Sequence, residues 1–171
     1  MTRQRGDLER IFAALEASGA RYLVVGGVAV VLHGHPRFTA DLDLVVALDA
    51  ENVQRVLEAL GELDYRPRAP VAAKELADPA RREDWIRNKR MTVFSLWSPV
   101  LAGTEVDLFV EPPLPFEEAY ARSLELELRG VRVRVVSLED LVAMKRRAGR
   151  PGDLEDVRRL EAIARDLREG E

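Results

Sequence analysis

The sequence of 171 residues contains no cysteine, and this absence excludes several classes of site. Disulfide bonds, zinc–thiolate sites, iron–sulfur clusters and thiol catalysis all require cysteine. The only two histidines, His33 and His35, are too few for a histidine-rich metal site. A histidine at the end of a helix, followed by Gly34, explains them better than metal ligation does.

Long hydrophobic stretches are also missing. The longest apolar run, Tyr22 to Leu32, has 11 residues, whereas a helix needs roughly 20 to span a bilayer. The first seven residues lack the apolar segment of a signal peptide. We therefore expect a cytoplasmic protein that is not embedded in a membrane.

The chain has no excess of positive charge. It carries 26 basic and 30 acidic residues, a net charge of −4, so no overall basic field attracts nucleic acid. Basic residues do gather locally, in the segment 66–90 and in the cluster 145–150. The length and the 47% hydrophobic content indicate a single domain over residues 1–171, large enough to bury a core.

Hydrophobic periodicity predicts an α/β (α+β) fold with one largely antiparallel or mixed sheet flanked by helices. We expect its core at about 20–112 and a C-terminal hairpin with helices at about 116–168. Asp7 and Asp49 are expected to cap the first and third helices. The expected helices are 7–19, 28–32, 49–61, 71–77, 80–89, 116–122, 137–144 and 153–167; the expected strands are 22–25, 41–47, 91–97, 104–110, 124–128 and 131–135, of which the last four form two hairpins.

A glycine pair and two aspartates carry the strongest chemical signal. Gly26-Gly27 joins a predicted strand to a predicted helix, a geometry that presents free backbone N–H groups to a phosphate. Asp41 and Asp43 alternate with apolar residues along the next strand, so both carboxylates project from one face. Two adjacent carboxylates repel each other unless a cation such as Mg²⁺ lies between them. Each feature alone is also typical of a tight turn or of a strand facing solvent, but together they favour phosphoryl or nucleotidyl transfer.

A third carboxylate belongs to the same pattern. Asp107 lies midway along an apolar strand between Val106 and Leu108, where an unpaired carboxylate is costly. If this strand neighbours the strand of Asp41, three carboxylates converge. Glu105 projects from the same face as an auxiliary or a rival, but it lies nearer the turn.

These residues resemble the signature of the DNA polymerase β-like nucleotidyltransferase superfamily. The similarity is to its small, stand-alone prokaryotic members, which are relatives of the nucleotidyltransferase toxins of abortive-infection systems. It includes Gly26-Gly27, Arg37-Phe-Thr-Ala-Asp41-Leu-Asp43 and Glu105-Val-Asp107, and it extends to segments around 77–95 and 138–157. It thus covers most of residues 20–165.

The resemblance implies roles for individual residues. Gly26 and Gly27 would hold the triphosphate of a nucleoside triphosphate. Asp41, Asp43 and Asp107 would bind two Mg²⁺ or Mn²⁺ ions, and Asp107 would help to deprotonate the acceptor hydroxyl.

Arg37 and Thr39 are candidate contacts to the triphosphate or the metal loop, although a solvated loop and a strand edge explain them equally well. Lys145 and Arg150 are candidate phosphate ligands, and the alternative is the usual enrichment of cations in the last turn of a helix. Relatives often have a lysine at the position of Gly152, so one phosphate contact is in doubt here.

Three other residues have simpler structural explanations. Asp153 is a natural N-cap, and Asp156 stands in the first turn of the same helix. Trp85 could stack a nucleobase, but a place in the core explains it better.

The sequence therefore predicts a metal-dependent nucleotidyltransferase that moves a nucleoside monophosphate to a hydroxyl and releases pyrophosphate. The acceptor, a protein, a transfer RNA or a small molecule, stays open, and its platform must come from residues after Arg66, the C-terminal helices or a second subunit. Two alternatives are a toxin–antitoxin component that acts by the same chemistry and a non-catalytic nucleotide-binding module.

Overall fold

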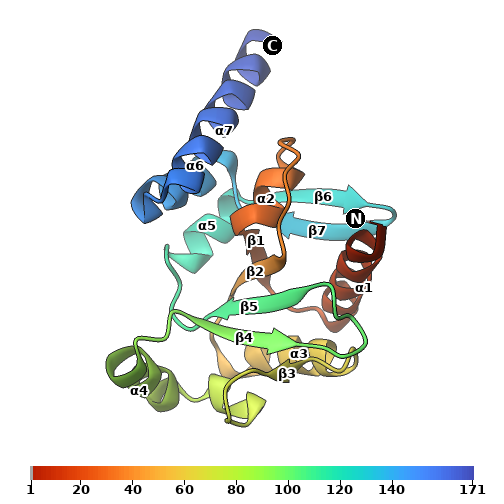
Figure 1. Ribbon diagram of the computed structural model, residues 1–171, viewed down its shortest axis with the longest axis vertical. Helices are drawn as coiled ribbons and strands as arrows, with labels where there is room; N and C mark the ends of the chain where they lie inside the picture. The colour runs from red at the N-terminus through yellow and green to blue at the C-terminus, as the bar shows by residue number, and fades with distance from the viewer. Residues whose placement is uncertain (1) are drawn as a thin grey trace.

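The computed structural model describes residues 2–171, with side chains from Arg5 onward. Its elements follow the predicted α/β order with one mixed sheet (Figure 1). The helices are α1 (Thr2–Ser18), α2 (Gly26–Leu32), α3 (Ala50–Gly61), a short 3₁₀ helix (Ala73–Ala77), α4 (Pro79–Lys89), α5 (Phe116–Arg122), α6 (Leu138–Ala148) and α7 (Pro151–Glu169); the strands are β1 (Tyr22–Val25), β2 (Asp41–Val46), β3 (Arg66–Pro67), β4 (Val93–Trp97), β5 (Glu105–Phe109), β6 (Leu124–Leu128) and β7 (Val131–Val135).

The seven strands form one sheet in the order β3-β4-β5-β2-β1-β7-β6. The pairs β2–β5 and β1–β7 are parallel and the other neighbours are antiparallel. Both predicted hairpins, β4–β5 and β6–β7, are confirmed. The sheet therefore brings β2 and β5, which are far apart in the sequence, into direct contact at its centre.

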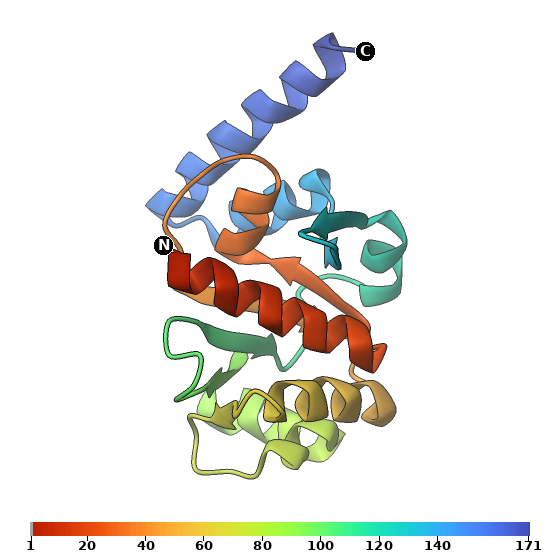
Figure 2. The same ribbon diagram turned by 90° about the vertical axis from the view of Figure 1, so that its right-hand side faces the viewer.

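The alternation along β2 separates a core face from a polar face. Leu42 and Leu44 are fully buried in the cluster that also holds Phe12 of α1 and Val56 of α3. Helices α1 and α3 pack against each other along the sheet (Figure 2). The first turns of helix α7 contact α6, and its C-terminal half projects away from the sheet and the other helices (Figures 1 and 2).

Several helix boundaries differ from the prediction. Helix α1 begins at Thr2, so Asp7 lies inside it and is not its N-cap. The helix residues before Leu8 are polar or glycine, so hydrophobic periodicity could not reveal this first part of the helix. Helix α2 begins directly at Gly26, and α6 continues beyond Met144 to Ala148. The capping role of Asp49 is confirmed, because its side chain accepts a hydrogen bond from the N–H of Asn52 at 2.9 Å.

Trp85 belongs to the core. Its side chain is 2% exposed and stacks on Phe94 of β4 with ring centroids 5.3 Å apart. It therefore anchors α4 to the sheet and is not available to stack a nucleobase. His33 ends α2, and its Nε2 lies 2.8 Å from the carbonyl oxygen of Val136, which agrees with the structural explanation of this histidine.

In the part of the chain that the structure describes, every helix is too short or too polar to cross a bilayer.

Candidate active site

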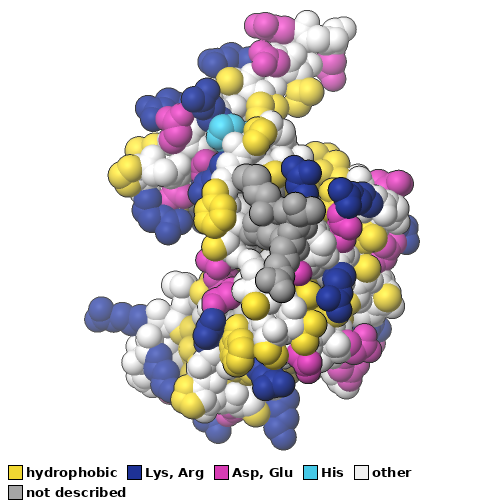
Figure 3. All heavy atoms as spheres, turned by 45° about the vertical axis from the view of Figure 1, so that its right-hand side comes forward, with side chains coloured by type: hydrophobic (Ala, Val, Ile, Leu, Met, Phe, Trp, Pro, Cys, Tyr) yellow, Lys and Arg dark blue, Asp and Glu magenta, His cyan; other side chains and the backbone are white. Residues whose placement is uncertain are grey.

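A cleft of about 820 Å³ opens beside the polar face of β2 and β5. Figure 3 shows the molecule hollowed between the part formed by α6 and α7 and the part formed by α4. The nine residues predicted for the site all line this cleft: Gly26, Gly27, Arg37, Thr39, Asp41, Asp43, Asp107, Lys145 and Arg150. The lining also includes residues that the sequence analysis did not single out, among them Thr92, Phe109 and Pro113.

Both glycines of the pair lie so close to neighbouring side chains that a Cβ atom would not fit, and Gly26 also has a backbone conformation that favours glycine. Gly26 has φ +66°, and a Cβ there would overlap Oδ2 of Asp43 and lie 3.0 Å from its Cγ. A Cβ on Gly27 would lie 2.6 Å from Oγ1 of Thr39. Side-chain-free residues at the β1–α2 junction therefore make room for one aspartate of the site and for the loop before β2. The first turn of α2 has no side-chain cap, which leaves its N–H groups without a partner from that source.

The three predicted carboxylates come from adjacent parallel strands. Asp43 of β2 lies opposite Asp107 of β5, and Asp41 lies opposite Glu105. Neighbouring strands lie roughly 4.8 Å apart, and residues directly opposite each other in the ladder project from the same face of the sheet. The sheet therefore brings Asp41, Asp43 and Asp107 together beside the glycine pair.

The pKa values of Asp43 and Asp41 are raised first by burial and then by the neighbouring carboxylates. Burial raises the pKa of Asp43 to about 7, and the carboxylates of Asp107 and Asp41 add to this rise, while Lys145 and Arg150 oppose it. The pKa of Asp41 is also raised, by burial and then by Asp107 and Glu105. Without a bound cation, the folded protein therefore holds negative charges close together at an energetic cost.

The donor set fits a hard divalent cation. Carboxylate oxygens are the ligands that Mg²⁺ and Mn²⁺ prefer, and Asp43 and Asp107 are cross-strand neighbours whose side chains can reach one ion. As placed, no three His, Cys, Asp or Glu side chains among the described residues are gathered around a single point that could hold a metal. The backbone register aligns the strands that carry these carboxylates, with Asp43 directly opposite Asp107.

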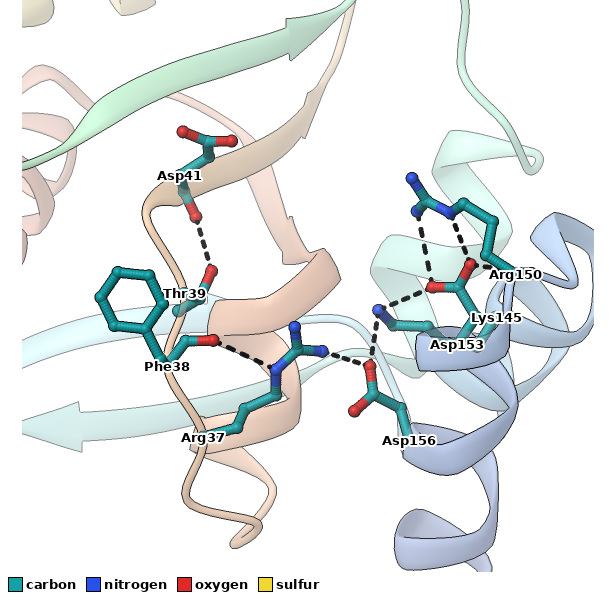
Figure 4. A network of polar contacts seen from close by, with 8 residues as sticks. All are labelled: Arg37, Phe38, Thr39, Asp41, Lys145, Arg150, Asp153 and Asp156. Carbon is teal, nitrogen blue, oxygen red and sulfur yellow. Dashed lines mark hydrogen bonds and ion pairs between the residues drawn. The ribbon is translucent and has the colours of Figure 1, made fainter.

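Cations of the cleft are tied to α7 by a buried ion-pair network (Figure 4). Lys145 of α6, 8% exposed, lies 3.2 Å from Asp153 and 3.0 Å from Asp156. Arg150 donates to Asp153 at 2.7 Å, and Arg37 pairs with Asp156. Lys145 therefore does more than offset a helix dipole, and Arg37 is not a freely solvated loop residue.

Two predictions for α7 need correction. Helix α7 begins at Pro151, which is favoured at the first helical position, so its N-cap is Arg150 and not Asp153. Asp153 is the third residue of the helix, and its carboxylate accepts a hydrogen bond from the backbone N–H of Arg150 at 3.3 Å. Asp156 is the sixth residue of α7 and lies in its second turn, not its first, where it bridges Lys145 and Arg37. Its spacing of three residues from Asp153, which puts both carboxylates on one helix face, is the signal that could have revealed this role.

The loop before β2 lies against the same network. Thr39 donates its hydroxyl to the backbone carbonyl of Asp41 at 3.2 Å, and Nε of Arg37 donates to the carbonyl of Phe38 at 3.3 Å (Figure 4). The loop thereby leads directly into the aspartate strand while Arg37 anchors it to α7.

We expect Asp153→Asn to lower the free energy of unfolding by about 2 kcal/mol at neutral pH, since it removes one partner from a buried, charge-assisted cluster. Burial raises the pKa of Asp153, but hydrogen bonds from Arg150 and Lys145 outweigh it and hold the pKa below its usual value. A depressed pKa stabilises the fold above the unfolded pKa of about 3.9 and loses this effect as pH falls through the folded pKa.

Urea denaturation between pH 3 and pH 8 tests this. The difference from wild type should be constant above pH 5 and shrink below pH 4. The matched control is Asp166→Asn, an exposed position on the same helix, which should change stability by less than about 0.5 kcal/mol. Equal stability of Asp153→Asn and wild type at pH 7 would contradict a stabilising network.

A mixed sheet with two aspartates on one strand, a third on its parallel neighbour and a glycine pair at the preceding strand–helix junction is the arrangement of a polymerase β-like nucleotidyltransferase. Residues 7–166 match the family described as "Nucleotidyltransferase of unknown function (DUF6036)". The chain belongs to this family and is a nucleotidyltransferase, as the sequence analysis predicted. Nucleotidyltransferases of this kind generally use divalent metals.

Several solved structures share the fold of this chain. The lincosamide antibiotic adenylyltransferase LnuA, bound to lincomycin, has a TM-score of 0.62 and 18% identity over 92% of this chain and 96% of its own. The antibiotic-resistance factor ANT(2'')-Ia has a TM-score of 0.59 and 16% identity over 98% and 92%. An antigenic nucleotidyltransferase-like protein from Paracoccidioides brasiliensis has a TM-score of 0.58 and 19% identity over 95% and 76%. No curated protein sequence matches the chain.

Proposed function

We propose that the protein transfers a nucleoside monophosphate from a nucleoside triphosphate to the hydroxyl of a small molecule and releases pyrophosphate. The observation that carries this proposal is the meeting of Asp41, Asp43 and Asp107 beside Gly26-Gly27 in one cleft. The acceptor oxygen forms a bond to the α-phosphorus, the bond between this phosphorus and the bridging oxygen of the β-phosphate breaks, and the hydroxyl proton passes to Asp107.

In this proposal each element of the cleft has its own task. The bare backbone at Gly26-Gly27 binds phosphate oxygens through N–H groups. Arg150, whose side chain is mostly exposed at the cleft, binds the triphosphate through bidentate hydrogen bonds. Lys145 and Arg37 add positive charge beside it. Asp41, Asp43 and Asp107 would hold two Mg²⁺ or Mn²⁺ ions, which when bound would supply Lewis-acid stabilisation of the charge that develops during the transfer.

Two observations support a small acceptor. The cleft of about 820 Å³ lies in the range of sites that enclose small molecules, roughly 300–1,000 Å³. Among the structures with this fold, LnuA was solved with lincomycin and ANT(2'')-Ia with adenylyl-2''-tobramycin, and both chains are matched over nearly their whole length. A role in a toxin–antitoxin pair stays a prediction.

The test is incubation of the protein with each α-labelled nucleoside triphosphate, Mg²⁺ or Mn²⁺, and separated pools of cell RNA, protein and small molecules. We expect label in the small-molecule pool together with released pyrophosphate, and neither with the Asp41→Asn variant. Label on RNA or protein would contradict the proposal of a small-molecule acceptor but would still support nucleotidyl transfer. Binding of a nucleoside triphosphate without pyrophosphate release in any pool would favour a binding module.

A further inference from the structure

Ser95 lies at the centre of β4, directly beside one of the three carboxylates. Its hydroxyl donates a hydrogen bond to Oδ1 of Asp107 at 2.6 Å. The register places Ser95 opposite Asp107 and places Asp107 opposite Asp43. The three side chains therefore form one row across β4, β5 and β2, on the sheet face opposite the buried Phe94 and Leu96.

The choice of serine at this position needs an explanation. Strand centres favour β-branched and aromatic residues, which pack better on a pleated, half-buried surface. Ser95 is half-buried on the polar face of the sheet. Its backbone carbonyl accepts the N–H of Arg68 at 2.9 Å, a bond that any residue could make. The hydrogen bond to Asp107 is the contact in the structure that uses the side chain.

We propose that Ser95 is a positioning residue that fixes the carboxylate of Asp107 for binding a divalent cation, an inference that rests on the proposed function. The short hydrogen bond restrains rotation of the carboxylate and leaves Oδ2 and the second lone pair of Oδ1 to act as ligands. Without this hydrogen bond, repulsion from Asp43 would favour side-chain conformers of Asp107 in which its carboxylate points away from Asp43 and from the proposed cation site between them. Hydrogen bonds that orient a ligating carboxylate are typically worth 10–100-fold in metal affinity.

Two substitutions at Ser95 that introduce side chains of nearly equal shape distinguish the effect of the hydroxyl from the effect of packing. Ser95→Thr keeps the hydroxyl, and Ser95→Val replaces it with a methyl group in a residue that strands accept well. Titration of the full chain with Mn²⁺, followed by electron paramagnetic resonance of the free ion, measures affinity without any turnover. We expect Ser95→Thr to bind within about threefold of wild type and Ser95→Val to bind at least about tenfold more weakly.

A second readout is the dependence of pyrophosphate release on Mg²⁺ concentration. With Ser95→Val, half-maximal rate should require at least about tenfold more Mg²⁺, while the rate at saturating Mg²⁺ recovers most of its wild-type value. A merely structural role would lower stability without this shift, so urea denaturation of both variants accompanies the titrations. Ser95→Ala, which only removes an atom, replaces the valine variant if that variant does not fold.

Each outcome bears on one inference. Mn²⁺ affinity of Ser95→Val or Ser95→Ala equal to wild type would overturn the role of Ser95, and so would a threonine variant as weak as the valine variant. Failure of the proposed function looks different, because wild type itself would then neither bind Mn²⁺ at this site nor release pyrophosphate.

Discussion

Asp43→Asn should abolish nucleotidyl transfer and at the same time make the metal-free protein more stable. The substitution removes a half-buried predicted metal ligand with almost no change in shape, so we expect a loss of at least about a thousandfold in the rate of pyrophosphate release. It also removes a carboxylate that burial and the charges of Asp107 and Asp41 destabilise. The expected gain in the free energy of unfolding is about 2 kcal/mol at pH 8.

The pH dependence of this gain follows from the raised pKa. In the unfolded chain Asp43 titrates near 3.9, whereas burial raises the pKa of Asp43 in the fold to about 7. Between these values the folded state holds a proton that the unfolded state has lost, so the stability of wild type falls as pH rises and levels off above pH 7. The asparagine variant lacks this dependence, and the difference between the two proteins should vanish below pH 4.

Denaturation in the presence of Mg²⁺ completes this test. An ion that binds only the folded state stabilises it by an amount that grows with the ratio of its concentration to Kd, so Mg²⁺ should raise the stability of wild type and not that of Asp43→Asn. Transfer by Asp43→Asn at the wild-type rate would refute the assignment of Asp43. A variant less stable than wild type at pH 8 would instead mean that the carboxylates are compensated without a metal.

The features of the candidate site that are local in the sequence could be predicted from it. The alternation around Asp41 and Asp43 fixes the face from which both project, and the glycine pair marks the strand–helix junction. The apolar strand around Asp107, and then the resemblance to a known superfamily, added the third carboxylate. The prediction that Asp107 joins them depended on β5 lying next to β2. That adjacency is set by the packing of the whole sheet, and the structure provides it.

Contacts between distant segments could not be predicted in the same way. The bond from Ser95 to Asp107 depends on the register of the β4–β5 hairpin, which the turn type and loop length fix, and the sequence analysis did not derive that turn. The pairing of Asp156 with Arg37, 119 residues apart in the chain, depends on how α7 packs beside the loop before β2. The two-residue strand β3 has no pattern of its own, because two residues are too few to display a period.

Gly26→Ala should damage both the fold and the chemistry, for two separable reasons. An alanine with φ near the observed +66° costs about 1–2 kcal/mol of backbone strain. Its Cβ would also overlap Oδ2 of Asp43 and lie 3.1 Å from the Cβ of that residue. Because this neighbour is a short side chain on a central strand, the aspartate must turn away from the cleft. We expect a loss of at least about a hundredfold in transfer rate and of about 2 kcal/mol or more in stability.

Gly19→Ala separates the two causes. Gly19 has φ +71°, and a Cβ there would meet nothing within 4 Å, so this variant bears the backbone strain alone, at the turn between α1 and β1. It should lose about 1–2 kcal/mol of stability and keep the wild-type transfer rate. If Gly26→Ala also kept that rate while losing the same stability, then Asp43 would not need the space beside Gly26, and the glycine would serve the backbone turn only. Loss of transfer in Gly26→Ala alone would tie the missing side chain to the position of the catalytic carboxylate.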